Sequence, residues 1–328
     1  MDPGQRRRLR RQLAFTGLGA LTGLAFDRLR GTGAPVLGAA TGTVISVGII
    51  AIQQAIIRTR LGEALRRLPL IASSAVVAIA YSAVILSTVA VAMRLDAGIW
   101  RFDATAFILS LGATVFFTSV NTIGHLVGWR VLRNVLIGRY RHPVREERIF
   151  LFLDLAGSTT LAERLGELRV QELIARFYFD IAQPIAVHDG EIYQYRGDEI
   201  SVTWPLSGER DARCVACAFA IRDSIAARAD WYRAAFGAVP EFRIGLHGGP
   251  VVAGEVGDER REIMYFGDTI NVAARIQALA KREGRAVCVS GDLLARLDLP
   301  AGVQATPLGS FQLQGKQQRT EVFSLTVA

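Results

Sequence analysis

The chain has 328 residues, 51% of them hydrophobic, and a formal net charge of +8. This length allows two domains, and the hydrophobic content predicts that one of them lies in a membrane. The excess of arginine lies mainly in the first 145 residues, at the ends of apolar runs, which indicates membrane topology. We therefore expect no nucleic-acid partner.

The first part of the chain contains uncharged stretches of helical length. Three of them are long enough to cross about 30 Å of hydrocarbon as helices: residues 34–57, 69–93 and 104–129. An earlier stretch, residues 12–26, would span only if Arg28 and Arg30 extended to the interface, and an interfacial helix is the alternative. The sequence thus predicts about four spans.

Charges between these stretches favour an orientation with both chain ends in the cytoplasm. The N-terminal tail and the segments after the second and fourth stretches are rich in arginine, whereas the other segments also contain aspartate. We therefore predict an all-α, four-helix transmembrane bundle over residues 1–130, in contact with lipid in the cell inner membrane. Glycines four residues apart let helices pack closely, within or between chains: Gly19 with Gly23, and Gly38 with Gly42.

Residues 131–148 are a short basic connector, which Gly138 and Pro143 interrupt, so a long coiled coil is not supported. The remaining residues, 149–328, alternate strand and helix signals, with helices near 158–188, 209–236 and 269–282. Strand signals cover 149–154, a hairpin over 191–204, and runs near 242–246, 251–256, 287–290, 309–313 and 321–326. This order predicts an α+β fold, with a βαββαβ core and helices over an antiparallel sheet.

Two aspartates are expected at neighbouring strand ends. An apolar run ends in Asp154, and Ser158 and Thr159 follow in a small-residue turn, where they are expected to cap the next helix. Asp198 lies near the tip of the hairpin. Two adjacent carboxylates repel each other, and a pair of Mg²⁺ or Mn²⁺ ions is the usual compensation.

Five blocks of this half resemble the class III nucleotidyl cyclases, which convert ATP or GTP to the 3′,5′-cyclic monophosphate and pyrophosphate. They follow the family's order and cover nearly all of residues 146–328: FLDLAGSTTLAERLG (152–166), IYQYRGDE (192–199), FRIGLHGGPVVAGEVG (242–257), FGDTINVAARIQ (266–277) and LGSFQLQGK (308–316). The resemblance implies a membrane-anchored bacterial cyclase, whose catalytic domain, residues 149–328, has a ferredoxin-like core.

The resemblance also implies an active site that is shared by two copies of the chain. Asp154 and Asp198, with the backbone carbonyl of Leu155, would hold two Mg²⁺ or Mn²⁺ ions per active site. The second copy of a homodimer would supply Asn271 and Arg275 for the ribose and the α-phosphate.

Lys316 would bind the terminal phosphates. It is one of only two lysines among 38 basic residues, the other being Lys281, and a compact ammonium in a glycine-rich turn indicates a specific role. Cys214 and Cys217 form a CxxC without a second pair, so they predict buried packing rather than zinc binding. His247 is expected to have a structural role.

The base preference is open. Adenine-selective members of the family usually have Lys at the position of Gln194 and Asp or Thr at that of Met264, whereas guanine-selective members have Glu and a small residue such as Cys. This chain has neither pair, and a glutamine amide can rotate to suit either base. We predict ATP as the substrate and GTP as the alternative. A second alternative is an inactive nucleotide-binding dimerisation module under a membrane receptor, which the presence of every site residue disfavours.

Overall fold

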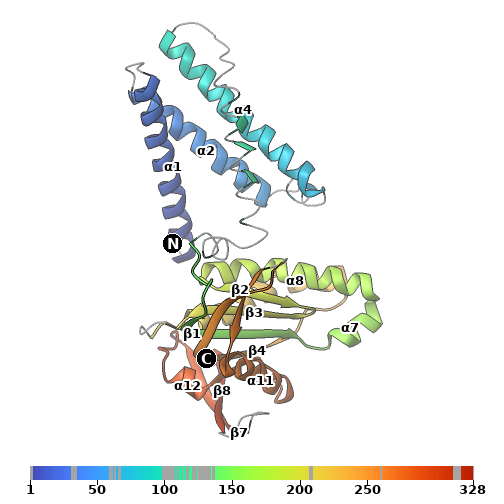
Figure 1. Cartoon of the computed structure of the whole chain (residues 1–328). Coiled ribbons are helices and arrows are strands. Elements are labelled where there is room, and N and C mark those ends of the chain that lie inside the picture. The colour runs from blue at the N-terminus through green and yellow to red at the C-terminus, as the bar shows by residue number, and fades with distance from the viewer. Residues whose placement is uncertain are drawn as a thin grey trace. The chain divides into compact units, whose positions relative to one another are not determined.

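Contacts divide the chain into two units, residues 1–133 and 134–328. The computed structural model in Figure 1 describes residues 3–30, 35–58, 68–97, 137–206, 210–258, 261–312 and 319–327, together with isolated positions between 62 and 134.

The first unit contains three described helices, α1 (Pro3–Arg30), α2 (Pro35–Arg58) and α4 (Leu70–Ala97). Two segments within them, Pro35–Ile56 and Ala72–Leu95, are long and apolar enough to cross a membrane, and few of their residues are buried within the chain. The predicted stretch at 12–26 forms the middle of α1. The predicted span at 104–129 lies outside the described residues except for isolated positions.

Glycines hold α1 and α2 close together. A Cβ atom at Gly23 would overlap the carbonyl oxygen of Gly38, and one at Gly42 would overlap that of Gly19. Because both obstacles are backbone atoms, no rearrangement of side chains could make room. The two glycine pairs that predicted close packing therefore face each other, and they do so within one chain.

The second unit is built on one mixed sheet. Its strands are β1 (Val144–Leu155), β2 (Glu191–Arg196), β3 (Glu199–Pro205), β4 (Phe242–Val256), β5 (Glu262–Phe266), β6 (Val287–Ser290), β7 (Val303–Phe311) and β8 (Thr320–Val327). They are ordered β2-β3-β1-β4-β6-β8-β7, and β5 pairs with β4. All these pairs are antiparallel except β4 with β6, so the expectation of a wholly antiparallel sheet was wrong.

Helices cover both faces of this sheet. They are α7 (Ser158–Leu165), α8 (Glu167–Val187), α9 (Arg213–Ala226), α10 (Ala229–Phe236), α11 (Asp268–Arg282) and α12 (Gly291–Leu294). Side chains alternate along β1: Leu151 and Leu153 join the core cluster under α8 and α9, whereas Phe150 and Phe152 join the cluster that includes Ala273 of α11. Figure 1 shows α8 and α11 on opposite sides of the sheet.

One strand replaces the two that the Gly-Gly-Pro sequence predicted between residues 242 and 256. β4 pairs with β1 without interruption from Phe242 to Ala253. Its glycines are packing positions rather than turn positions, since a Cβ at Gly249 would lie 2.9 Å from Oγ1 of Thr269, and one at Gly248 2.9 Å from Cδ1 of Leu293.

Other element boundaries also differ from the prediction. The long helix expected at 158–188 is divided at Gly166, which has φ 81°, and the helix expected at 209–236 is divided between α9 and α10. β5 was not predicted. β1 begins at Val144, so residues 144–148 of the predicted connector belong to the sheet.

Gly245 of β4 sets the distance between the sheet and α11. A Cβ atom there would lie 2.6 Å from Cα of Gln277 and 2.8 Å from the carbonyl oxygen of Ala273, both backbone atoms of α11. Gly245→Ala is therefore expected to displace the helix and to lower stability by about 2 kcal/mol, or about 4–8 °C in the melting temperature of a domain of this size. Thermal unfolding of the full chain in detergent measures this effect.

Gly254→Ala is the matched control, because its Cβ would meet only Pro143 atoms at 3.8–3.9 Å, an ordinary contact. Equal melting temperatures for the two variants would mean that α11 is not held by this contact.

Candidate active site

Asp154 and Asp198 lie at the same corner of the sheet. Asp154 is opposite Glu199 in the pairing of β1 with β3, and the N–H of Leu155 donates a hydrogen bond of 3.4 Å to the carbonyl oxygen of Asp198. By the alternation along β1, Asp154 is on the α11 face, as Phe150 and Phe152 are. The structure thus brings the two aspartates together, as their positions at strand ends predicted.

Three carboxylates, those of Asp154, Asp198 and Glu199, interact at this corner. The pKa of the Glu199 carboxyl is raised, first by burial and then by repulsion from Asp154 and Asp198, although Arg196 acts in the opposite direction. The pKa of Tyr178 is also raised, first by burial and then by Asp198. A cation bound here would relieve the repulsion among these carboxylates.

Tyr178 of α8 supports the hairpin that carries Asp198. Its hydroxyl donates a hydrogen bond of 2.9 Å to the carbonyl oxygen of Gly197, and its ring lies 4.7 Å from the ring of Tyr195 between centroids. Sequence analysis did not identify this residue, because its partner is close only after α8 has packed beside the hairpin.

A lysine contacts the first of the two aspartates. Nζ of Lys281, near the end of α11, lies 2.7 Å from Oδ2 of Asp154, and this hydrogen bond is the main cause of a raised pKa at Lys281. The Asp154 side chain is 15% exposed, whereas that of Lys281 is 51% exposed. The lysine can therefore leave the carboxylate for solvent at little steric cost.

The donor set suits an ion that shares its coordination with substrate. Within the described part of the chain, no group of three or more His, Cys, Asp or Glu side chains could hold a metal ion. Mg²⁺, however, is commonly bound by one or two carboxylates together with substrate phosphates and water. Two aspartates meet this requirement, and the Leu155 side chain packs in the core at 1% exposure, which leaves only its backbone for a ligand.

The turn after Asp154 differs from the prediction in its cap. Gly157, with φ 71°, occupies the N-cap position of α7, and no side chain caps the helix. Ser158 and Thr159 are already helical, so the expectation that they cap it was wrong. Glycine takes this position because the chain turns there through the left-handed region.

Asn271 and Arg275 occupy the first half of α11. Asn271 is exposed, and Nη1 of Arg275 is buried without a hydrogen-bond partner among the described residues. At 1.5 Å per residue, Asn271 is about 15 Å and Arg275 about 9 Å along the helix from Lys281, which contacts Asp154. Both residues thus lie on the turns of α11 that precede the contact with Asp154.

Gln194 lies on β2 and Met264 on β5, two strands that do not pair but are linked by neighbouring side chains. Both side chains are exposed, Met264 at 37%. Their neighbours Tyr193 and Tyr265 have ring centroids 5.1 Å apart, although three strands separate β2 from β5 in the sheet. Phe150 contacts both rings, at 6.4 and 5.5 Å. This aromatic cluster links β2 to β5, the strands that carry the two residues predicted to contact the base.

Arg148 also links β2 and β5, through an ion pair with one and a cation–π contact with the other. It is 3% exposed, its Nη1 lies 2.7 Å from Oε2 of Glu191 in β2, and its guanidinium lies 5.0 Å from the ring centroid of Tyr265 in β5. Its Nη2 also donates to the hydroxyl of Tyr140 at 3.3 Å. Removing one partner of such a buried ion pair leaves an uncompensated charge, so this network stabilises the spacing of β2 and β5.

A known protein family matches nearly all of this unit. Residues 143–326 match the family model described as "Adenylate and Guanylate cyclase catalytic domain". The chain belongs to this family. The class III cyclase family that the sequence motifs indicated is thereby confirmed.

Relatives extend the match beyond the catalytic domain. Adenylate cyclase 2 of Rhizobium meliloti (strain 1021) is 38% identical over 318 residues, which are 93% of this chain and 87% of the relative. Adenylate cyclase 1 of the same strain is 31% identical over 188 residues, 55% of this chain and 28% of the relative. The chain is thus a homologue of adenylate cyclase 2 and carries a cyclase domain.

Solved structures of cyclases have the same fold. The adenylyl cyclase CyaB from P. aeruginosa gives a TM-score of 0.51 at 18% identity, covering 57% of this chain and 97% of that chain. A bacterial light-regulated adenylyl cyclase gives a TM-score of 0.56 at 24% identity, covering 67% and 63%. At these identities the likeness supports the fold alone.

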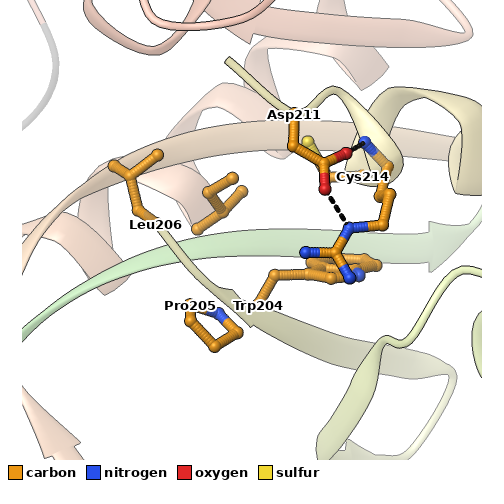
Figure 2. A pocket seen from close by; sticks show the side chains of 7 residues that line it. Trp204, Pro205, Leu206, Asp211 and Cys214 are labelled. Carbon is orange, nitrogen blue, oxygen red and sulfur yellow. Dashed lines mark hydrogen bonds and ion pairs between the residues drawn. The ribbon is translucent and has the colours of Figure 1, made fainter. Parts of the chain in front are cut away.

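Two cavities in the described part of the chain lie away from the aspartates. A cavity of about 10 Å³, room for roughly one water, lies at the opposite end of β3, where Asp211 forms an ion pair with Arg213 beside Trp204 and Cys214 (Figure 2). A hollow of about 390 Å³ lies at the start of α11, lined in part by Glu147, Asp268 and Asp292. His247 and Arg296 also line this hollow, and Nη1 of Arg296 lies 2.7 Å from Oε2 of Glu147.

Four further residues were singled out in the sequence: Lys316, Cys214, Cys217 and His247. Lys316 lies outside the described residues. Cys214 and Cys217 are free and fully buried, and burial raises the pKa of Cys214 to about 12, as expected for packing residues. His247 is 5% exposed, and its Nδ1 lies 2.6 Å from Oγ of Ser290, which fits a structural role.

Proposed function

We propose that this cyclase is a membrane-bound enzyme that converts ATP to 3′,5′-cyclic AMP and pyrophosphate in a homodimer. The observation that carries the proposal is a separation along α11: Asp154 and Asp198 meet at one corner, where Lys281 contacts Asp154, whereas Asn271 is about 15 Å along the helix from Lys281. A second copy could bring Asn271 and Arg275 to these aspartates.

Each active site would combine metal ligands of one copy with phosphate-binding residues of the other. Asp154 and Asp198, with the Leu155 carbonyl, would hold two Mg²⁺ or Mn²⁺ ions. When bound, these ions would promote attack of the ribose 3′-hydroxyl on the α-phosphorus and neutralise the leaving pyrophosphate. Arg275 of the second copy would donate hydrogen bonds to the charge that develops on the α-phosphate. Its buried Nη1 has no hydrogen-bond partner among the described residues of its own chain.

The remaining residues would bind and orient the nucleotide. Asn271 would orient the ribose, Lys316 would bind the terminal phosphates, and Gln194 with Met264 would contact the base. Membrane attachment rests on the two apolar helices α2 and α4. We extend it to four spans with both chain ends in the cytoplasm, so that the catalytic domain meets cytoplasmic ATP.

The direct test is a parallel assay of membranes that contain the full chain, with ATP or GTP as substrate and Mn²⁺ as the ion. We expect cyclic AMP as the main product. An excess of cyclic GMP over cyclic AMP would favour the guanylate cyclase alternative. Nucleotide binding without either cyclic product, at any metal concentration, would favour an inactive dimerisation module.

Base preference should respond to two substitutions. The double variant Gln194→Glu, Met264→Cys introduces the guanine-type pair, and each gained or lost hydrogen bond changes binding by about 1 kcal/mol, or about fivefold. We therefore expect the ratio of kcat/KM for GTP to that for ATP to rise by roughly 10- to 30-fold. The variant Tyr195→Phe, between Gln194 and the hairpin tip, is the control. An unchanged ratio would mean that these positions do not contact the base.

A further inference from the structure

Lys281 contacts the first aspartate of the predicted metal site, and neither sequence patterns nor the family's motif residues gave it a role. Its Nζ lies 2.7 Å from Oδ2 of Asp154, across 127 residues of chain. It is one of two lysines in a chain that otherwise uses arginine for positive charge. Lysine suits a place where a compact cation must form and break a contact with one carboxylate.

A divalent ion and this ammonium compete for the same carboxylate. The pair joins the site's first aspartate to the end of α11, and Lys281 is half-exposed, so it can move into solvent. The ammonium interacts with both Asp154 and Asp198 and thereby offsets part of the repulsion between them. An ion that binds Oδ2 of Asp154 would have to displace it.

We propose that Lys281 is a positioning residue that holds the Asp154 carboxylate in the metal-free site and is displaced by the divalent ion. The proposal rests on the proposed function, in which Asp154 is a metal ligand. The lysine would keep the two aspartates close before the ion arrives, and it would weaken binding of the ion until nucleotide phosphates add their own contacts. The divalent ion would thus bind weakly without nucleotide.

The contact of Lys281 with Asp154 would also connect the two active sites of the dimer, because of where the residues lie along α11. Lys281 contacts the aspartate of its own chain, whereas Asn271 and Arg275, on the preceding turns of α11, are proposed to serve the partner's aspartates. One helix would therefore contribute to both active sites of the dimer. Displacement of Lys281 changes a contact at one end of α11, about 9 Å along the helix from Arg275.

The test is a titration of the full chain in detergent with Mn²⁺ alone. The electron paramagnetic resonance signal of free Mn²⁺ measures how much of the ion is bound. A partly exposed pair is worth at most about 1 kcal/mol, so Lys281→Met should bind Mn²⁺ about three- to fivefold more tightly than the natural chain. Lys281→Arg, which keeps the charge, should bind within about twofold of it.

Arg282→Met is the matched control. It removes a positive charge one residue further along, from a side chain that pairs with Glu283 rather than with Asp154, and should leave Mn²⁺ affinity unchanged. If Lys281→Met binds Mn²⁺ no more tightly than Arg282→Met does, the proposal is overturned. Weaker binding by Lys281→Met would also overturn it.

Asp154→Asn separates this failure from failure of the metal site itself. Loss of Mn²⁺ binding in Asp154→Asn, without tighter binding in Lys281→Met, would reject only the role of Lys281. Equal Mn²⁺ binding by Asp154→Asn and the natural chain would reject Asp154 as a metal ligand, and with it both the proposed function and the role of Lys281.

Discussion

Asp154→Asn is expected to lower the rate of cyclic AMP formation at least about a hundredfold, the loss that corresponds to about 3 kcal/mol of transition-state stabilisation. Asparagine keeps the size of the side chain and removes the negative charge that would bind the ion. The surrounding strands should remain paired, because β1 is hydrogen-bonded on both sides by β3 and β4. The measurement is Mn²⁺-dependent activity in membranes that contain equal amounts of each variant.

Asp223→Asn is the matched control for this loss. Asp223 is exposed on α9, away from the sheet corner, and its substitution removes the same charge from the same domain. We expect its activity to remain within about twofold of the natural chain. Retention of more than about a tenth of the activity by Asp154→Asn would contradict the assigned role, because a metal ligand contributes more than that.

Arg275→Ala should lower turnover by about 10²- to 10³-fold, the typical effect of removing one donor to a developing negative charge. The KM for ATP should change less than kcat, because the guanidinium would act mainly on charge that forms in the transition state. Steady-state kinetics with ATP and Mn²⁺ distinguish these two effects.

The exposed Arg282, near the end of the same helix, provides the comparison. Arg282→Ala removes the same charge from α11 but no proposed contact with substrate, so its kcat should stay close to that of the natural chain. A large rise in KM with unchanged kcat in Arg275→Ala would instead indicate that the arginine binds substrate and transition state equally.

Local patterns were sufficient to predict the corner that holds the aspartates. The apolar run before Asp154 and the hairpin around Asp198 are short-range signals, and both elements formed as expected. Their meeting follows from the antiparallel pairing of β1 with β3, which the order of elements suggested. The resemblance to the cyclases added the roles of residues on α11, which no local pattern assigns.

The features that differ from the prediction depend on tertiary packing. Gly248 and Gly249 suggested a turn, yet they remain in one long strand because Leu293 and Thr269 occupy the space where side chains would be. Arg148 belonged to a basic connector whose charges indicated membrane topology, but it is buried between Glu191 and Tyr265. Such partners are distant in sequence, so composition alone cannot identify them.

Lys281 illustrates the same limit at the site itself. The scarcity of lysine was a usable signal, and it directed attention to Lys316 because that residue lies in a matched motif. The partner of Lys281 becomes apparent only when α11 packs against β4 through Gly245, which places the end of the helix beside Asp154.

Mixing two inactive variants tests most directly whether each active site combines aspartates of one copy with α11 of another. When Asp154→Asn and Arg275→Ala chains are co-expressed equally, about half of randomly formed dimers are mixed, and each has one intact site, giving about a quarter of natural activity. Mixing Asp154→Asn with Asp198→Asn should restore nothing, since no site is then intact. Activity from the first mixture that does not exceed the sum of its separate variants would contradict the shared site.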